Sequence, residues 1–477
     1  MRKKLTIYQP GCSYPDPHLW LEPANLLSIR FSVFEGLVRY DEKLNIVPLL
    51  AESWEASEDA KTWVFTLRND VAFHDGSPLT AADAAASIRN ATREDIPGAL
   101  GTNSLLYAYL GNAAVSAPDD RHVRIELPEP MADIADLLVY IMIIPEKYIG
   151  KDPQTIPGTG PYRFGSIEGN RYTFTRFGSY WDTPSEVETL VFTEEKDADK
   201  RLEALLRGDA DVITRVERTQ IPAVNAAPGI TLKQSDSPVA VPLMLNCFSG
   251  PFTDVRVRRA VNYGTDTDEI IRKVYNGCAA PITGPLTRNH FGVDPDAKPY
   301  PYDPEKAKAL LAEAGYGNGL DLTMFRPTVL PNESPEIAAL LKEQWSRIGI
   351  RLSEDVRENR EQYALDVRNK KIRDFCIFDS APASTYRVLH EKLDSSYHGP
   401  WWQGYSSREF NEIMAKAVRT VDTESRRMLY RQAIRIASEE AAWCYLCSPF
   451  TFAAVTNQVS EEFPALFSRA DGVYLVK

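Results

Sequence analysis

The chain has 477 residues, of which 44% are hydrophobic and 25% are charged. This length exceeds what a single hydrophobic core usually supports, so we expect a soluble globular protein with two or more lobes. The 66 acidic residues outnumber the 54 lysines and arginines, and the net charge of -12 disfavours nucleic acid and anionic membrane surfaces as partners.

The N-terminal residues do not form a complete secretion signal. Met1 to Lys4 is basic, as such signals are, but no apolar segment follows it. Residues 5–8 instead predict a first strand, and Cys12 lacks the small apolar residues that precede a lipid-attachment cysteine. We therefore expect a mature chain whose leader is absent from this sequence. Residues 137–144 form an apolar run that is too short to span a bilayer.

The first half of the chain predicts mostly strands. Residues 63–67 alternate between apolar and other side chains with the two-residue period of a half-buried strand. Thr80 and Asp83 have the spacing of a capping box ahead of an alanine-rich helix. Residues 171–177 alternate again, and a strand near 187–192 precedes a helix near 197–206.

The second half predicts helices and strands in alternation. Asp266, Asp303-Pro304 and Ser334-Pro335 begin three helices, because apolar residues follow them at spacings of three and four. The later elements are a strand, helix and strand over 350–378, helices near 408–418 and 424–441, and a strand over 443–455. Two lobes joined by crossing strands are typical of a hinge that closes on a ligand.

The sequence contains no strong catalytic or metal-binding motif. We find no G-x-S-x-G, H-E-x-x-H or phosphate-loop pattern, and no two of the six histidines have metal-ligand spacing. Cys444 and Cys447 form the one close cysteine pair, but a strand points them to opposite faces, which favours buried or incidental thiols over redox or zinc chemistry. We therefore expect no catalytic residue, no metal and no cofactor, although distant residues can assemble a triad.

A series of motifs runs along the chain in a fixed order. The motifs are Ser53-Trp54 to Asp59, 61–68, Phe73-His74-Asp75-Gly76, 78–81 with Asp83, 158–162, Tyr180-Trp181, 208–211, 255–262 and 302–307. Their number and order resemble the family 5 solute-binding proteins of ABC importers, the peptide, opine and nickel group. The resemblance extends from about residue 5 to residue 455.

The resemblance implies an α/β fold of the type II periplasmic binding protein kind, with two lobes joined by a hinge. Lobe I would contain residues 1–236 with an inserted subdomain over about 40–160, and lobe II residues 237–446. Residues 447–477 would return to lobe I. The implied function is the substrate-binding component of an ABC importer, which captures a small solute between the lobes and delivers it to membrane permease subunits. Such a protein is not an enzyme, and we expect a monomer in the periplasm or an extracellular lipoprotein.

The resemblance also indicates candidate polar ligand contacts. Similar peptide binders have an acidic-Tyr-Pro-Asp-Pro stretch after a lobe II strand, where the acid pairs with the peptide amine. This chain has Asp379 there without the rest of the motif. Asn246 matches a hinge-strand position of the family, where an asparagine satisfies either backbone groups or ligand groups. Arg387 is a candidate for a bidentate pair with a carboxylate or phosphate, with a solvated surface arginine as the alternative.

Aromatic residues supply the other candidate ligand contacts. Trp401, Trp402 and Tyr405 lie where relatives have a short loop facing the cleft, and they either pack in the core or form a stacking wall. Tyr14 and Trp20 follow the first strand, where the family's chain enters the cleft, with lobe packing as the alternative. Such walls favour a peptide-like solute, an opine or a sugar conjugate.

Other functions remain as alternatives at this stage. The sequence departs from that of a standard di- or oligopeptide carrier in the motif that is missing after Asp379. It also lacks the histidine or arginine placement that would match a nickel-chelate carrier. A ligand sensor shares the fold, but the sequence has no DNA-binding segment. A secreted hydrolase is opposed by the missing catalytic motifs.

Overall fold

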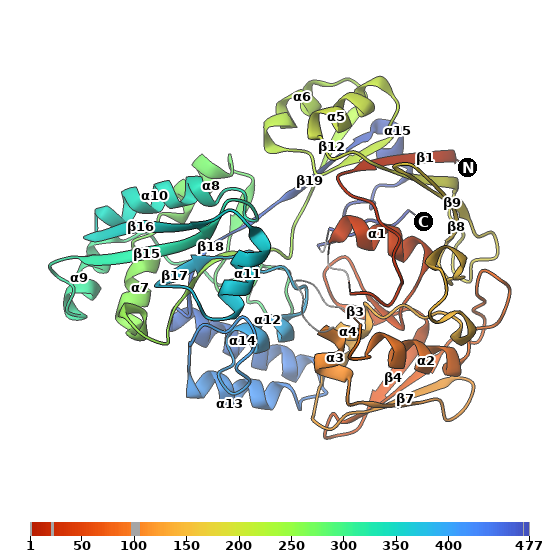
Figure 1. Ribbon diagram of the computed structural model, residues 1–477, viewed down its shortest axis with the longest axis horizontal. Helices are drawn as coiled ribbons and strands as arrows, with labels where there is room; N and C mark the ends of the chain where they lie inside the picture. Colours follow the sequence, from red (N-terminus) through yellow and green to blue (C-terminus); the bar gives the residue numbers. More distant parts are fainter. Residues whose placement is uncertain (1, 21–22, 97–104, 471, 477) are drawn as a thin grey trace. The chain divides into compact units, whose positions relative to one another are not determined.

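The computed structural model describes residues 2–20, 23–96, 105–470 and 472–476. The chain divides into two compact units (Figure 1). Unit 1 contains Met1–Ser235 and Thr451–Lys477, and unit 2 contains Asp236–Phe450. The chain therefore passes from unit 1 to unit 2 after Ser235 and returns after Phe450. Within the described ranges, no helix has both the length and the apolar character that crossing a membrane requires.

Unit 1 is built on a seven-stranded sheet. Its strands, in spatial order, are β12 (Ile230–Ser235), β19 (Thr451–Thr456), β11 (Val212–Thr214), β1 (Arg2–Gln9), β10 (Val187–Glu194), β9 (Arg171–Arg176) and β8 (Tyr162–Glu168). β1 pairs in parallel with β10 and β11, whereas β19 lies antiparallel between β11 and β12. The C-terminal strand therefore completes a sheet that the N-terminal strand began.

A second sheet of unit 1 explains the alternation in residues 63–67. It contains β4 (Ala51–Ala56), β5 (Thr62–Leu67), β7 (His122–Glu126) and β6 (Ala114–Ser116). Trp63, Phe65 and Leu67 are buried on one face of β5, which confirms the predicted strand. Helix α2 (Ala81–Ala91) packs on this sheet and begins with the predicted capping box of Thr80 and Asp83.

The remaining elements of unit 1 are short. They are α1 (Ala24–Val33), β2 (Val38–Tyr40), β3 (Ile46–Pro48), α3 (Leu105–Leu110), α4 (Ile134–Leu138), η2 (Glu146–Tyr148), η3 (Pro153–Thr155), α5 (Ala198–Arg207), η4 (Arg218–Gln220), α6 (Ile221–Ala226) and α15 (Asn457–Glu462). The predicted strand and helix near 187–206 correspond to β10 and α5.

Unit 2 contains a six-stranded mixed sheet. In spatial order its strands are β14 (Ala279–Pro281), β18 (Trp443–Pro449), β13 (Val241–Leu245), β17 (Phe375–Ile377), β15 (Leu320–Pro327) and β16 (Ile350–Arg357). β15 runs parallel to both β16 and β17, and β13 is antiparallel to its neighbours. The expected mixture of helices and strands in an α/β fold is confirmed.

The helices of unit 2 include the predicted ones. These helices are η5 (Pro251–Thr253), α7 (Val255–Tyr263), α8 (Thr267–Val274), α9 (Pro304–Glu313), α10 (Ser334–Ser346), α11 (Arg360–Arg368), α12 (Thr385–Lys392), α13 (Arg408–Ala417) and α14 (Thr423–Glu439). Of these, η5, α7 and α12 were not predicted. Asp266 and Asp303 cap α8 and α9 through their side chains, as expected, because each carboxylate accepts a backbone N–H of the first turn.

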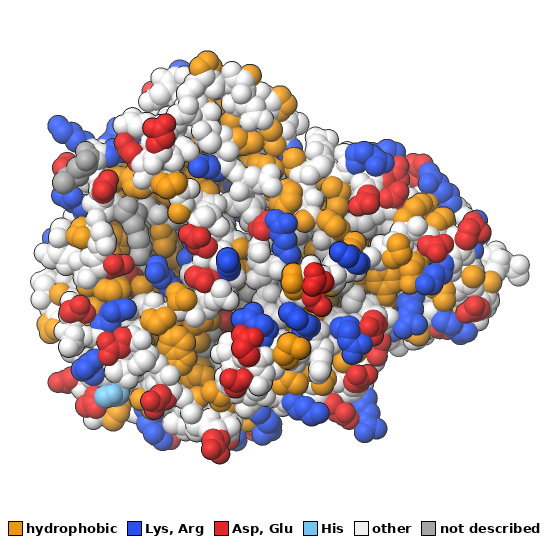
Figure 2. Space-filling view, turned by 180° about the vertical axis from the view of Figure 1, so that it is seen from behind, with side chains coloured by type: hydrophobic (Ala, Val, Ile, Leu, Met, Phe, Trp, Pro, Cys, Tyr) orange, Lys and Arg blue, Asp and Glu red, His pale blue; other side chains and the backbone are white. Residues whose placement is uncertain are grey.

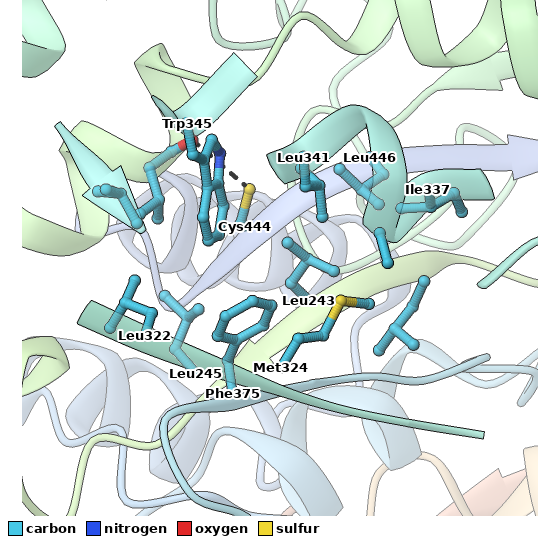
Figure 3. Close-up of a cluster of buried hydrophobic side chains, with 14 of the residues drawn as sticks. Leu243, Leu245, Leu322, Met324, Ile337, Leu341, Trp345, Phe375, Cys444 and Leu446 are labelled. Atoms are coloured by element: carbon cyan, nitrogen blue, oxygen red, sulfur yellow. Dashed lines mark hydrogen bonds between the residues drawn. The ribbon is translucent and has the colours of Figure 1, made fainter. Parts of the chain in front are cut away.

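The core of unit 2 lies between its sheet and α7 to α10 (Figure 3). Trp345 of α10 is fully buried, its ring lies 5.2 Å from that of Phe375, and its Nε1 donates to Thr265 Oγ1 at 3.0 Å. Cys444 of β18 lies in the same core, and burial raises the pKa of its thiol to about 12. Cys444 and Cys447 are both buried, and neither forms a disulfide, which agrees with the structural thiols that the sequence favours.

Candidate functional site

The parallel strands of unit 2 bring three chain segments to one edge of the sheet. β15, β16 and β17 point the same way, so their carboxyl ends lie at a common edge, from which α11 and α12 then begin. In open α/β sheets, ligands bind at the carboxyl ends of the strands. We call this region the carboxyl edge and define it by Phe325, Arg357, Arg360, Phe378 and Asp379.

Aromatic rings form a continuous wall at the carboxyl edge. Tyr363 of α11 stacks on Phe325 at 4.8 Å and on Phe378 at 6.1 Å between ring centroids. Trp401 continues the series at 5.1 Å from Phe378. The hydroxyl of Tyr363 donates to the backbone carbonyl of Ile377, which holds α11 against β17. Phe325 and Tyr363 are fully buried and Phe378 is 6% exposed, so Trp401 at the end of the series is the partly exposed ring of this wall.

Charged groups lie beside this wall. Arg360 precedes Tyr363 by one helical turn, and its guanidinium lies 4.8 Å from the Phe378 ring centroid. Its Nη2 donates to Asp379 Oδ1 at 2.8 Å. Lys392 Nζ lies 5.9 Å from the same ring and donates to Ser380 Oγ at 2.8 Å. Burial raises the pKa of Asp379 and outweighs the opposing effect of the Arg360 guanidinium.

The structure brings two of the predicted site residues together. Asp379 and Trp401 both contact the carboxyl edge, Asp379 through Arg360 and Trp401 through Phe378. Trp402 has different neighbours: its Nε1 donates to the Tyr405 carbonyl at 2.5 Å and its ring lies 4.9 Å from Phe248. The two adjacent tryptophans therefore belong to different packing environments.

Three other predicted residues of unit 2 are engaged inside the unit. Tyr405 is only 3% exposed and its hydroxyl donates to Glu440 Oε2 at 2.7 Å, which matches the core alternative. Arg387 is buried and its Nε donates to Glu391 Oε1 at 2.9 Å, so the surface alternative is wrong.

Asn246 is the third of these residues. Its Nδ2 donates to the Arg373 carbonyl at 2.6 Å, and its Oδ1 accepts the Phe248 backbone N–H at 3.1 Å. Both ends of the amide are therefore used to hold the chain that follows β13. These contacts support the backbone role of the two roles expected for an asparagine here.

The predicted residues of unit 1 pack against aromatic neighbours. The ring of Tyr14 stacks on Phe164 at 4.8 Å and on Phe34 at 5.9 Å, and burial raises the pKa of its phenol. Trp20 lies 4.8 Å from Tyr140. These contacts favour the packing alternative for Tyr14, which borders the core of unit 1.

Several sequence motifs contribute contacts that hold unit 1 together. Buried Glu35 accepts hydrogen bonds from Thr159 Oγ1, Tyr180 Oη and Trp181 Nε1 at 2.7 to 2.9 Å. Gly160 packs so closely on Val33 that a Cβ would lie 2.8 Å from the Val33 carbonyl carbon. The motifs at 158–162 and 180–181 therefore meet at one carboxylate.

Arg360, Tyr363 and Lys392 were not among the predicted site residues. The available signal was positional, because Arg360 begins the helix that follows a predicted strand and Tyr363 lies one turn later. The described ranges contain no group of three or more His, Cys, Asp or Glu side chains placed to hold a metal ion.

Known proteins match this chain over most of its length. The sequence profile of the bacterial extracellular solute-binding proteins, family 5 Middle, matches residues 45–385. Heme-binding protein A of Haemophilus influenzae is 27% identical over 474 residues, covering 93% of this chain and 86% of that protein. The dipeptide-binding protein of Escherichia coli is 26% identical over 443 residues, covering 87% and 83% respectively.

A solved structure shows the same fold. HbpA2 from Haemophilus parasuis superimposes with a TM-score of 0.85 at 24% identity, covering 95% of this chain and 96% of that one. The two curated relatives are named as binding proteins, and proteins of this family bind small molecules as the substrate-binding components of ABC importers. The match over 45–385 and the shared fold lead to one assignment: the chain belongs to the family 5 bacterial extracellular solute-binding proteins.

Proposed function

We propose that this protein captures its solute at the carboxyl edge of unit 2 and delivers it to the permease of an ABC importer. The observation that carries the proposal is the aromatic wall of Phe325, Tyr363, Phe378 and Trp401 beside the Arg360–Asp379 pair. Binding sites for small molecules combine apolar surfaces with a few placed polar groups; here the half-buried Trp401 supplies the apolar group and the partly exposed Arg360–Asp379 pair supplies the polar ones.

The wall supports a solute with a flat or apolar part and a small number of polar groups. A peptide-like molecule, an opine or a sugar conjugate has this character, and one relative is named for heme and another for dipeptides. A standard peptide carrier has less support, because Arg360 already binds the Asp379 carboxylate that a peptide amine would need. A nickel-chelate carrier is a further alternative that no contact at the carboxyl edge favours.

The organisation expected from the resemblance forms part of the proposal. We take unit 1 as lobe I, with the sheet of β4 to β7 within the inserted subdomain at 40–160, and unit 2 as lobe II. The return to lobe I is taken at Thr451 rather than at the expected 447, because β18 continues to Pro449 in the sheet of unit 2. The unit boundaries at Ser235 and Thr451 support this division. Closure of the lobes on the solute stays a prediction. It requires that the solute bind the closed arrangement more tightly than the open one, because only such a difference in affinity shifts the equilibrium. Small-angle scattering with and without solute measures it.

The protein is proposed to act as a monomeric carrier outside the cytoplasm, without catalysis. The family name and the binding-protein relatives support this reading. Figure 2 shows acidic and basic side chains interspersed over the visible face, without the broad basic surface that nucleic acid requires.

A thermal-shift screen of the purified protein tests the proposal. The panel contains peptides, opines, sugar conjugates and metal chelates, and native mass spectrometry of the protein as purified detects any solute already bound. A ligand at a hundredfold over its Kd adds about 2.7 kcal/mol of stability, which a melting curve resolves. Saturable binding without turnover supports a carrier, whereas turnover of a bound compound supports the hydrolase alternative.

The adjacent tryptophans provide a matched pair of variants. Trp401→Ala removes the end of the aromatic wall and is expected to weaken solute binding by roughly 2- to 10-fold, the usual value of an aromatic contact. Trp402→Ala removes a ring that packs on Phe248 and is expected to leave the Kd unchanged. Equal effects of both changes, or binding of no solute in the panel, would contradict the proposed site.

A further inference from the structure

A groove on the surface of unit 2 shares no residue with the carboxyl edge. It has a volume of about 460 Å³, and its walls come from α7, the segment 298–301, α9 and the end of α14. Lys298, Pro301 and Lys306 are exposed, so the groove is open to solvent. Sites for small molecules bury most of their ligand, and an open groove of this size therefore fits a segment of another protein better.

Three cationic side chains line the groove, namely Arg259, Lys298 and Lys306. Within the described ranges, none of the three forms an ion pair with an acidic side chain, and Arg259 Nε donates to the backbone carbonyl of Glu439 at 2.8 Å. Glu439 also lines the groove, but its carboxylate accepts from Arg435 Nη1 at 2.9 Å. The groove is therefore a basic site on a protein whose net charge is -12.

Two tyrosines form the walls of the groove. The rings of Tyr263 and Tyr300 meet edge to face with their centroids 5.1 Å apart. Tyr300 Oη donates to the Ser438 carbonyl at 2.7 Å, which ties the segment 298–301 to α14. Lys306 Nζ donates to Tyr263 Oη at 2.7 Å and lies 3.9 Å from the centroid of that ring. Charged and aromatic groups are thus held in place before a partner binds, which reduces the entropy that binding would cost.

Two of the motifs that this chain shares with its family meet at the groove. Arg259 lies in the motif at 255–262 and Lys306 in the motif at 302–307, and neither motif contributes a residue to the carboxyl edge. The relatives are named for different solutes, such as heme and dipeptides, whereas the proposed function requires a permease of every carrier. The two motifs therefore fit contact with a protein partner better than contact with a solute.

We propose that this groove binds an acidic segment on the extracytoplasmic side of the permease. Carboxylates of the segment pair with Arg259, Lys298 and Lys306, and its chain lies against Tyr263 and Tyr300. Opposite charges across an interface speed the encounter and select the partner. This inference rests on the proposed function, because it takes the permease as the partner.

Two peptides that differ only in charge test the groove on the full chain. One is a fluorescein-labelled hexapeptide of alternating glutamate and proline, and the other has glutamine in place of each glutamate. By fluorescence anisotropy at low ionic strength, the wild-type protein is expected to bind the glutamate peptide about 10-fold more tightly, as three exposed ion pairs allow. The difference is expected to shrink as salt is added, because salt screens exposed charges.

Charge reversal at the two exposed lysines of the groove provides the decisive variant. Lys298→Glu/Lys306→Glu is expected to weaken binding of the glutamate peptide by about 10-fold, to the level of the glutamine peptide. Lys151→Glu/Lys200→Glu makes the same change of charge at two exposed lysines of unit 1 and is expected to bind the peptide nearly as the wild type does. Thermal unfolding checks that both variants are folded, and both are expected to bind solute with the wild-type Kd.

Proteoliposomes that contain the permease and ATPases of the importer identify the occupant of the groove. At equal solute occupancy, the groove variant is expected to stimulate ATP hydrolysis about 5- to 10-fold less than the wild type. The control variant is expected to stimulate it like the wild type.

The outcomes separate this inference from the proposed function. Equal binding of the two peptides by the wild type, or equal weakening in the two variants, overturns the groove as a site for acidic segments. If the groove variant binds solute and stimulates ATP hydrolysis like the wild type, the permease is not the occupant, and the carrier function stands. Vesicles of phosphatidylglycerol serve as a second probe, and loss of vesicle binding without loss of peptide binding in the groove variant would assign the groove to lipid. If no solute binds, the proposed function fails and the permease fails with it as the partner.

Discussion

The buried imidazole of His18 contributes a measurable pH dependence to the stability of unit 1. His18 is 2% exposed; its Nε2 lies 3.0 Å from the Met142 carbonyl and its Nδ1 lies 2.8 Å from Asn90 Nδ2. Arg93 donates to Asn90 Oδ1, which turns the amide N–H₂ group of Asn90 toward the imidazole. The site therefore fits a neutral ring, and burial lowers the pKa of His18 to about 4.

The sign of this effect follows from proton uptake on unfolding. An exposed histidine titrates near 6.5, so between pH 6.5 and about 4 the unfolded chain binds a proton that folded His18 does not. The stabilisation is complete above pH 6.5 and is lost as the pH falls toward 4, at up to about 1.4 kcal/mol per pH unit.

Urea unfolding between pH 7 and pH 4.5 measures this loss. His18→Gln is expected to show a shallower fall in the free energy of unfolding of unit 1 than the wild type, because glutamine does not titrate. The wild-type slope does not vanish in this variant, because burial also lowers the pKa of His74 to about 4. Parallel curves for the two proteins would show that His18 is not a source of the dependence.

At the residue scale, the sequence predicted residue types better than their roles. Asp379 and Trp401 were selected and both contact the carboxyl edge. Arg360 was not a predicted site residue, because its place at the carboxyl edge depends on its contact with Phe378. Phe378 follows a different strand, and the sequence does not show that the two side chains meet. Trp401 and Trp402 are chemically alike, and only the path of their loop decides which one stacks on Phe378.

At the scale of one element, the N-cap of α2 provides a sharp test of a sequence motif. Thr80 Oγ1 accepts the Asp83 backbone N–H at 3.2 Å, and Asp83 Oδ2 accepts the Thr80 N–H at 3.2 Å. Thr80→Ala removes the first of these bonds and is expected to destabilise the first turn of α2 by about 1 to 2 kcal/mol. Hydrogen exchange of the α2 amides measures the change.

A conservative change at the same position serves as the control. Thr80→Ser keeps the hydroxyl and is expected to leave exchange of the α2 amides near the wild-type rate. The amides of α9, which Asp303 caps in unit 2, report any global loss of structure. If the serine and alanine variants exchange equally fast, the cap does not stabilise α2 and the assigned motif has no energetic role.

Element starts were predictable because caps and periodicity are local signals, and Asp266, Asp303 and Thr80 all cap helices as expected. The partners of each strand were not predictable, because strand pairing depends on contacts between residues far apart in the sequence. The predicted strand over 443–455 is two strands, β18 and β19, which end and begin on either side of Phe450 and belong to different sheets. A continuous apolar pattern does not reveal such a change of sheet.

At the scale of the whole molecule, the two units differ in how the chain builds them. Unit 2 is one uninterrupted segment, 236–450, with its own sheet and core. Unit 1 needs both the first 235 residues and 451–477, because β19 pairs with β11 on one side and β12 on the other. Tyr474 and Val476 add two buried side chains to the core of unit 1. The C-terminal segment is therefore a structural part of unit 1 and not an appendage.

This asymmetry predicts opposite results for two truncations. The fragment 236–450 is expected to fold alone, with a cooperative thermal transition and near-ultraviolet circular dichroism from buried Trp345 and Trp443. A chain that ends at Phe450 is expected to lose the structure of unit 1, because β11 and β12 lose their shared neighbour. In that chain limited proteolysis should digest residues 1–235 and spare unit 2, and adding a peptide of residues 451–477 should restore protection. Survival of residues 1–235 without the peptide would mean that the sheet of unit 1 closes without β19.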